Sequence, residues 1–567
     1  MSEVQVVRGE MQPWTDHTTP RPALAALLTD VVPANRRTLI LGPHAPQQIE
    51  SVLAHSADVT ILVRSVADAQ QLGEDFGPCL QVIAGALDGL EGEPYDVIIA
   101  TDGLDRVLGY DSTDLSWTER LAALSRLATP DAVVVLALEN EFSLLNLLDS
   151  RPAHERHGDD EWRPLHDDPT RPVSVDQLKA ALPWRAEVYA DFASRTFVRA
   201  DVAAGARPGE LPTRLAIGAL EAIDVPLLSP PHEGVDTAAR AGLLASVPTG
   251  WLAISGAQPS HDLYAQTAQA VLTADQNLTG WDTTTTIGPG TAESDDEASV
   301  SARSAEALSF DPSVVPTTVP SGVSVETVLF RLAAAEDVPA FRKLAADLGE
   351  WVTASRVIVR WDDIIFDGES FAYGVSPWVA QESVEKDDLL TAAWVRFQDR
   401  LLGQHRRHPW PPWMVGDDLV SAWLGMSGIE PPEQLPATSP DTPPATAQQV
   451  ARGKELAAAL DLVLETRKDT VDVRTALAAA EEAKKELLEL KGHVYGLERT
   501  LGFRNKAMKT RENRIRELRG QLQRLTTAHE RIRGSRTYAV SRVIFHAAQV
   551  RKPKTVARKV ARRIRKR

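Results

Sequence analysis

The sequence predicts an α/β protein with a doubly wound parallel sheet, a smaller mixed α/β domain after it, and a long C-terminal coiled coil with a basic tail. Three observations predict this order. Short β-branched apolar runs alternate with helical stretches in the first 200 residues, seven of the thirteen tryptophans lie between Trp351 and Trp423, and an apolar seam of 3-4 spacing runs from Val473 to Ile532. Composition agrees, because 43% hydrophobic and 25% charged residues are near globular averages.

Residues 38–200 alternate between predicted strands and predicted helices. Helical stretches such as 46–55, 66–73 and 116–127 lie between apolar runs, at the spacing of repeated βαβ units. The runs that we expect to be buried parallel strands are Thr38 to Pro43, Asp58 to Val63, Leu80 to Gly85, Tyr95 to Thr101 and Asp131 to Leu138. We therefore expect a doubly wound domain here, preceded by an N-terminal segment, 1–37.

Further folded units and linkers are predicted between this domain and the coiled coil. The expected boundaries are 201–282 for an extension of the α/β domain, 283–323 for an acidic flexible linker, 324–428 for a tryptophan-rich accessory domain, and 429–447 for a proline-rich linker. Within the extension, the pattern predicts helices near 237–244 and 263–274 and a strand at 251–256.

A coiled coil is predicted within the next segment, 448–533. Fifteen of the eighteen seam positions between 473 and 532 are apolar, and Arg504 and Arg511 interrupt the seam. A 3.5-residue period kept over so many heptads is typical of a supercoil, because a helix packed on a globular core drifts off that period. We expect self-association through 473–532; a single solvated charged helix is the alternative.

The tail, 534–567, differs in charge from the rest of the chain. It carries twelve Lys or Arg and no acid, so the net charge of −17 divides into +12 on the tail and −29 on the first 533 residues. A basic amphipathic helix that binds an anionic membrane surface is expected, through Arg558, Lys559, Arg562, Arg563, Arg565, Lys566 and Arg567. Nucleic acid is the disfavoured alternative, because the acidic body would be repelled by phosphates.

The cysteine content and the N-terminus indicate where the protein works. The one cysteine, Cys79, can form neither an internal disulfide nor a cysteine-rich metal site. The N-terminus has no leader pattern, and no apolar run is long enough to span a membrane. We expect a cytoplasmic protein that is peripheral at the inner face of the cell membrane.

The turn after the first strand is the first place to look for a ligand in a doubly wound sheet. It reads LILGPHAPQQIE. Neither G-x-G-x-x-G nor G-x-x-x-x-G-K-[ST] is present, which argues against a nicotinamide dehydrogenase and a P-loop nucleotidase.

What remains resembles the class I S-adenosylmethionine-dependent methyltransferases. The resemblance rests on a first strand that ends at Gly42, on YDVIIATDGLDRV at 95–107, and on LATPDAVVVLALENEFSLLNLL at 127–148. It implies S-adenosylmethionine as cofactor, 95–107 as the fourth strand, and AEVYADFASRTFVRA at 186–200 as the final hairpin.

The family's cofactor loop, D-x-G-x-G-x-G, is matched in part. Gly42 matches the first glycine, whereas Ile40 replaces the acid, and His44 and Pro46 replace the next two glycines. The glycines of this loop let the backbone approach the cofactor, and the acid binds its ammonium group.

The resemblance places five residues around the cofactor: Gly42, His44, Arg64, Asp88 and Asp102. Arg64 ends the second strand, where the family keeps an acid, and would repel a sulfonium cation. His44 and Asp102 are the candidates for a general base. Two alternatives stay open: a methyltransferase with a divergent loop, or a retained fold that lost its site and became a scaffold.

Side chains that could bind a metal occur in two segments. Asp362, Asp363, Asp367 and Glu369 surround the dipeptide Asp367-Gly368, which favours a hairpin turn. A loop with His154, His157, Asp159, Asp160, His166, Asp167 and Asp168 lacks H-E-x-x-H spacing and favours a solvated loop. No metal site is expected.

The accessory domain has its own candidate surface. His405, His408, Trp410 and Trp413 could stack on a sugar or a base, and the alternative is that they pack into a small core. The domain resembles one that follows methyltransferase-like domains in some actinobacterial cell-surface polysaccharide clusters. That resemblance implies a role in envelope glycan assembly, with a lipid-linked glycan or a glycosyltransferase as partner.

Overall fold

The structure, a computed structural model, describes residues 4–12, 14–109, 111–151, 156, 168–223, 225–267, 270–285, 308–404, 406–411, 414, 417–429, 445–464 and 473–550. The chain divides into two compact units, Met1–Asp469 (unit one) and Thr470–Arg567 (unit two). Outside the described residues lie the acidic cluster at 293–297, six of the seven residues of the histidine loop, His405, Trp413, most of the proline-rich linker and the seven tail cations at 558–567.

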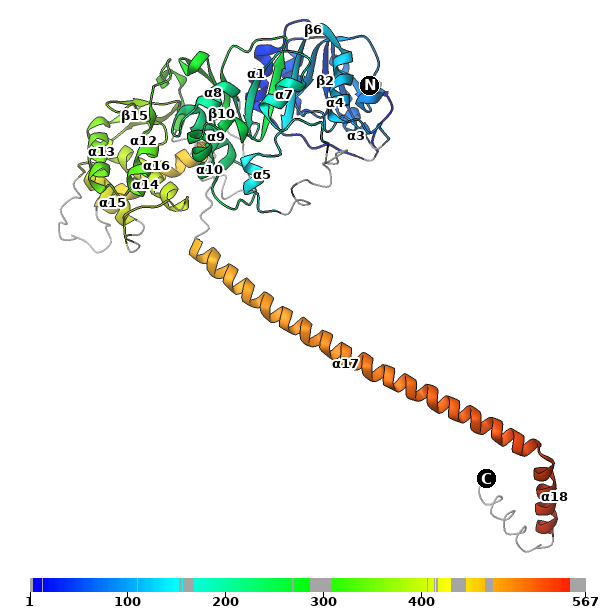
Figure 1. Ribbon diagram of the computed structural model, residues 1–567. Helices are drawn as coiled ribbons and strands as arrows, with labels where there is room; N and C mark the ends of the chain where they lie inside the picture. Colours follow the sequence, from blue (N-terminus) through cyan, green and yellow to red (C-terminus); the bar gives the residue numbers. More distant parts are fainter. Residues whose placement is uncertain are drawn as a thin grey trace. The chain divides into compact units, whose positions relative to one another are not determined.

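One twelve-stranded sheet runs through unit one, with helices beside it (Figure 1), in the order β1-β4-β3-β2-β5-β6-β9-β7-β8-β10-β11-β12. The strands are β1 Gln5–Val6, β2 Thr38–Leu41, β3 Val59–Val63, β4 Gln81–Ala84, β5 Tyr95–Ala100, β6 Ala128–Glu139, β7 Ala186–Phe192, β8 Thr196–Arg199, β9 Gly250–Ser255, β10 Leu263–Thr267, β11 Ala270–Ala274 and β12 Trp281–Thr285. The pairs among β1 to β6 are parallel. Strands β2 to β6 thus have the 3-2-1-4-5 order of a doubly wound sheet, which confirms the predicted fold class.

The other half of the sheet corrects one prediction. Strands β7 and β8 form the predicted hairpin, but β9 lies between β6 and β7 and is antiparallel to both. The predicted helix at 263–274 is instead the hairpin of β10 and β11. Leu263, Tyr264 and Ala265 are all buried, so this strand shows no polar alternation that would distinguish it from a buried helix.

Both faces of the parallel strands are buried. In β2, Leu39 and Leu41 belong to one core cluster and Ile40 to another, as expected when successive side chains point to opposite faces. The helices that precede the accessory domain include α1 Pro22–Val31, α2 Pro46–Leu53, α3 Val66–Phe76, α4 Trp117–Leu127, α5 Leu144–Leu148, α7 Val175–Ala181, α8 Ala200–Gly205, α9 Leu211–Glu221 and α10 Pro231–Arg240.

The accessory domain combines short strands with helices. Its elements are β13 Leu308–Phe310, β14 Val323–Ser324, β15 Ser355–Val357, β16 Ile364–Phe366, β17 Phe371–Tyr373, β18 Trp378–Val384, α12 Val325–Ala334, α13 Val338–Trp351, α14 Lys386–Gly403, α15 Asp417–Met426 and α16 Ala445–Val463. The strands form two three-stranded sheets. Helix α16, which begins beside the predicted boundary at 447, contributes Leu460 to the core of this domain.

The aromatic residues of this domain pack into its core. Trp410 is 8% exposed, and its ring centroid lies 5.0 Å from that of Phe341 and 5.1 Å from that of Trp423. Trp410 is therefore a core residue and not a free stacking surface. Asp367 lies in the predicted turn, where it accepts hydrogen bonds from the backbone of Glu369 and Ser370 between β16 and β17. Asp362 and Asp363 are instead bound by arginines, because Arg360 pairs with Asp362 and Arg214 pairs with Asp363.

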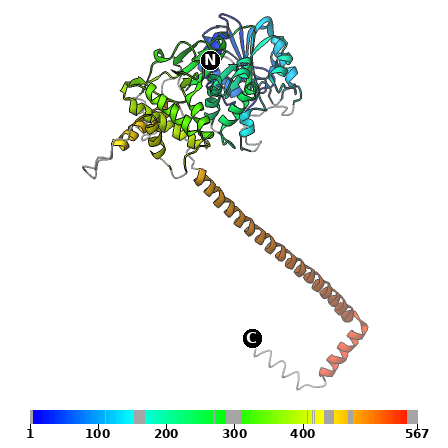
Figure 2. The same cartoon turned by 60° about the vertical axis from the view of Figure 1, so that its left-hand side comes forward.

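Unit two consists of helices in its described part. Helix α17, Val473–Gly534, runs for 62 residues, and both cartoon views draw it without a break (Figures 1 and 2). Helix α18, Arg536–Val550, follows after Ser535. Among the described residues, no helix has the length and apolar character needed to cross a membrane.

Candidate functional site

The candidate site lies at the edge of the sheet where β2 to β6 end, here called the carboxyl edge. Gly42 follows β2 in a left-handed conformation (φ 84°), and a Cβ built on it would lie 3.8 Å from Asp102, which follows β5. The order of the parallel strands reverses between β2 and β5. Gly42 and Asp102 therefore meet at the switch point, where doubly wound sheets bind ligands.

His44 is buried beside Gly42, with both ring nitrogens within hydrogen-bonding distance of neighbours. Nδ1 lies 3.0 Å from the Gly42 carbonyl oxygen, and Nε2 lies 2.7 Å from Thr101 Oγ1. Burial lowers the pKa of His44 to about 4, so the ring is neutral at pH 7. A neutral ring that donates from Nδ1 and accepts at Nε2 has no free nitrogen to act as a general base.

Asp102, the second candidate base, is paired with an arginine four residues further along the chain. Arg106 binds both oxygens of Asp102, with Nε 2.7 Å from Oδ2. The same guanidinium donates to the carbonyl oxygen of His17 at 3.1 Å. The carboxylate is thus neutralised inside the fold and not presented to a ligand.

Arg64, at the end of β3, forms a buried ion pair with Asp16. Its Nε and Nη2 lie 2.9 and 2.6 Å from the two carboxylate oxygens, and the two side chains are 0% and 1% exposed. The ring of Trp14 lies beside the guanidinium, 5.3 Å from its Cζ. The cation predicted to repel a cofactor is therefore compensated by an acid from the N-terminal segment.

Asp88, which follows β4, is also paired. It accepts hydrogen bonds from the Arg8 guanidinium and, at 2.9 Å, from the backbone of Thr113. Burial alone would raise the pKa of Asp88, but these two donors outweigh it and lower the pKa.

Two of these candidates, Arg64 and Asp88, have partners in one segment, residues 8–12 and 14–21, here called the strap. Along the carboxyl edge, Arg8 binds Asp88, Met11 forms a bridge with Ser65, and Arg21 donates to the carbonyl oxygen of Thr101. The strap therefore passes the ends of β4, β3 and β5. Sequence reasoning missed it because the segment has neither helical nor strand periodicity.

Two glycines allow the strap to pack closely against the carboxyl edge. A Cβ built on Gly109 would lie 1.9 Å from the Gly9 carbonyl oxygen, and one on Gly89 would lie 2.6 Å from that of Arg8. Any side chain at these positions would collide with strap backbone. In this fold, the glycines of these two loops make room for the chain itself.

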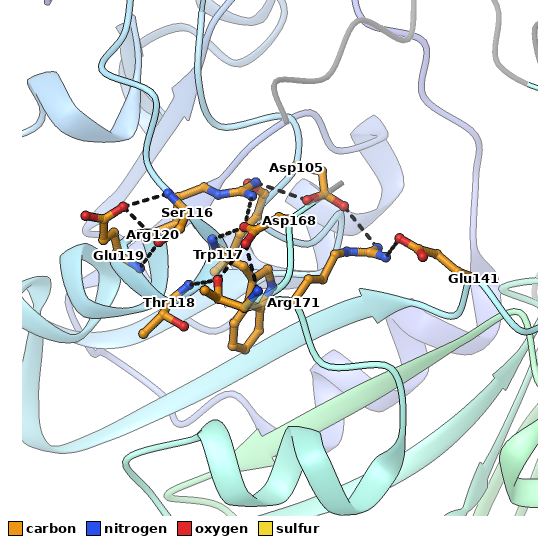
Figure 3. Close-up of polar contacts among 11 residues, drawn as sticks. Asp105, Ser116, Trp117, Thr118, Glu119, Arg120, Glu141, Asp168 and Arg171 are labelled. Carbon is orange, nitrogen blue, oxygen red and sulfur yellow. Dashed lines mark hydrogen bonds and ion pairs between the residues drawn. The ribbon is translucent and has the colours of Figure 1, made fainter. Parts of the chain in front are cut away.

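A second network of hydrogen bonds and ion pairs lies beyond the ends of β5 and β6 (Figure 3). Asp168 accepts a hydrogen bond from the backbone of Trp117, and Arg120 donates to the Leu104 carbonyl at 2.6 Å and to Asp105 at 3.0 Å. Asp168 thereby accepts the first backbone N–H of α4, whose N-cap is Ser116.

Arg171 extends this network, because it donates to Asp105 at 3.2 Å and to Glu141 at 2.6 Å (Figure 3). Asp105 follows β5 and Glu141 follows β6. Ion pairs within the chain therefore connect charged side chains at the ends of β3, β4, β5 and β6.

This arrangement does not fit S-adenosylmethionine. The cofactor is cationic and needs carboxylates that are free to receive its ammonium and ribose hydroxyl groups. Asp16 and Asp102 are each paired with an arginine through both oxygens, and Asp88 is paired with Arg8 through Oδ2, which leaves the buried Oδ1 of Asp88 without a hydrogen bond. The fully buried Arg64 occupies the end of β3. We therefore derive no reaction step through this cofactor.

Comparison with known proteins adds fold-level similarity only. No protein-family model and no curated protein matches the chain. Among solved structures, it is similar to the 1,6-didemethyltoxoflavin-N1-methyltransferase of Burkholderia thailandensis, solved with S-adenosylhomocysteine, at 20% identity over 21% of this chain and 52% of that chain (TM-score 0.17). It is also similar to the CcbJ methyltransferase of Streptomyces caelestis, at 16% identity over 22% of this chain and 51% of that chain (TM-score 0.17).

A third similar structure is an S-adenosylmethionine-dependent methyltransferase of Clostridium acetobutylicum, at 12% identity over 24% of this chain and 56% of that chain (TM-score 0.20). The chain spans about half the length of these three structures. The fold assignment rests on the strand order described above.

Proposed function

We propose that the chain is a methyltransferase-like scaffold protein that does no methyl transfer, self-associates through 473–532, and is recruited by its basic tail to the anionic inner face of the cell membrane. The observation that carries the proposal is the pairing of the charged side chains at the carboxyl edge. All four polar candidates for cofactor contact, His44, Arg64, Asp88 and Asp102, already have partners within the chain. An active methyltransferase would have to break several of these contacts before the cofactor could enter.

Calorimetric titration of the full chain with S-adenosylmethionine and S-adenosylhomocysteine tests the scaffold proposal. We expect no binding heat up to millimolar ligand, because each carboxylate would have to give up its guanidinium partner. Micromolar binding of either ligand would overturn the scaffold proposal and restore the enzyme alternative.

Recruitment to the membrane is supported by the charge of the tail. Each cation near an anionic membrane contributes about 1 kcal/mol, and the tail has twelve cations and no acid. Its test is co-sedimentation of the full chain with vesicles that contain 30% phosphatidylglycerol. Changing Arg558, Arg562, Arg563 and Lys566 to Gln is expected to reduce the bound fraction at least tenfold.

The matched control removes four exposed cations of unit one by changing Arg36, Arg185, Arg342 and Lys343 to Gln. It alters the net charge equally and is expected to change vesicle binding less than twofold. Equal loss in both variants would show a general charge effect and would contradict recruitment by the tail.

Envelope glycan assembly is the process in which we place this scaffold. The support is the resemblance of the accessory domain to one found in cell-surface polysaccharide clusters. The partner to seek is a lipid-linked glycan or a glycosyltransferase, and binding of an undecaprenyl-linked sugar to the full chain in vesicles is the direct measurement. No increase over vesicles without that lipid would remove the glycan part of the proposal.

A further inference from the structure

We propose that the partner of α17 is a second copy of the chain running in the opposite direction. This inference rests on the proposed self-association through 473–532 and adds the orientation of the two helices. It is carried by the exposed seam of α17, by the two arginines on that seam, and by the distribution of charge along the chain.

The seam of α17 is apolar and exposed. Each large apolar residue of the seam exposes between 48% and 70% of its surface. These residues are Leu487, Leu490, Val494, Leu497, Leu501, Met508, Ile515, Leu518, Leu522, Leu525 and Ile532. Ile515, Leu518 and Leu522 line a shallow groove along the helix. An apolar stripe of this length on a charged helix is stable in water when another helix covers it.

Arg504 and Arg511 limit how that second helix can lie. With Val494 and Leu501 at heptad position a, both arginines fall at position d, one heptad apart, and both are exposed. In a parallel, in-register pair, position d faces position d, so each arginine would face its own copy. Two successive layers of like charge would then lie inside the seam, which costs stability.

An antiparallel pair removes this conflict, because its layers join position a of one helix to position d of the other. A register centred between residues 509 and 510 places Arg504 against Ile515 and Arg511 against Met508 of the second copy. The long aliphatic stem of each arginine can then pack on an apolar residue while its guanidinium reaches water. The same register joins Leu501 to Leu518, Leu497 to Leu522, Val494 to Leu525 and Leu487 to Ile532.

The distribution of charge favours the same direction. The first 533 residues carry −29 and the tail carries +12. A parallel pair brings two acidic bodies to one end of the helices and two basic tails to the other. An antiparallel pair brings each basic tail to the end at which the second copy's acidic body is joined, so unlike charges meet.

The test uses the full chain in which the exposed Cys79 is changed to Ser. Two single variants are made on it, Leu497→Cys and Leu522→Cys, oxidised separately and as a mixture, with linked peptides identified by mass spectrometry. In the antiparallel pair, 497 of one copy faces 522 of the other, whereas two copies of 497 lie roughly 37 Å apart at ~1.5 Å per residue. We expect at least ten times more disulfide between the two variants than within either one.

Disulfides that form within each variant, and not between them, would overturn the antiparallel direction and leave self-association intact. A monomer mass in sedimentation equilibrium at 50 μM, with no disulfide in any sample, would overturn self-association itself. The two failures are therefore distinguishable. In both cases, the folded state of unit one is the check that the chain as a whole has folded.

Discussion

The two units of this chain differ in whether their side chains find partners within the chain. At the carboxyl edge of unit one, charged groups such as Arg64 and Asp16 are buried and paired within the chain. On α17 of unit two, leucines such as Leu522 and Leu525 are about 70% exposed, at 69% and 70%. The edge that resembles a binding site thus has its charged groups paired within the chain, whereas α17 leaves an apolar stripe exposed.

The largest expected effect is on the seam. Changing Leu497 and Leu518 to Asp should weaken self-association more than a hundredfold, because both apolar layers would then hold charges. Sedimentation velocity of the full chain across concentrations measures it. Lys506→Asn with Arg516→Gln removes two charges outside the seam and should change the association constant less than threefold. If this control lost as much affinity as the seam variant, association through the seam would be contradicted.

Breaking the buried ion pair should have the next largest effect. Asp16→Asn leaves the fully buried Arg64 without its acid, and we expect unit one to lose about 3–5 kcal/mol of unfolding free energy in urea. Asp58→Asn is the control, because its 3.9 Å pair with Arg37 is exposed and contributes about 0–1 kcal/mol. Similar midpoints for the two variants would show that the strap is not an integral part of the fold.

Acid should destabilise unit one partly through His44. Its folded pKa, about 4, lies below the usual value of 6.5, so the unfolded state binds the proton first. The resulting stability is complete above pH 6.5 and is lost as the pH falls towards 4, by about 3 kcal/mol. His44→Gln should reduce the dependence of the urea midpoint on pH over this range. The buried His232, with a pKa of about 3, leaves some pH dependence in that variant. An unchanged slope in His44→Gln would show that the ring titrates normally.

The smallest expected effect tests the approach of the strap. Gly109→Ala should cost about 1–3 kcal/mol, since its Cβ would overlap the Gly9 carbonyl. Gly92→Ala, where nothing lies within 4 Å of the added carbon, should stay within about 0.5 kcal/mol of the original. A neutral Gly109→Ala would mean that the strap can shift away from the loop.

The parallel half of the sheet could be predicted from the sequence, because buried runs such as 58–63 and 95–101 carry their own local signal. The hairpin of β10 and β11 could not, since its alanine-rich strands follow helical preference until they pair with β8 and each other. Gly42 and Asp102 could be placed at one edge from strand order alone. The contacts that cover this edge could not be predicted, because they join the strap to loops up to 105 residues away in sequence.

The length of α17 has an evolutionary consequence. A seam that repeats every seven residues keeps its faces aligned only when residues are gained or lost in sevens, each step adding about 10.5 Å. Insertions of other sizes would rotate one part of the stripe away from the other. Homologous chains with longer or shorter rods should therefore differ by multiples of seven residues here, while the loops of unit one vary by any number.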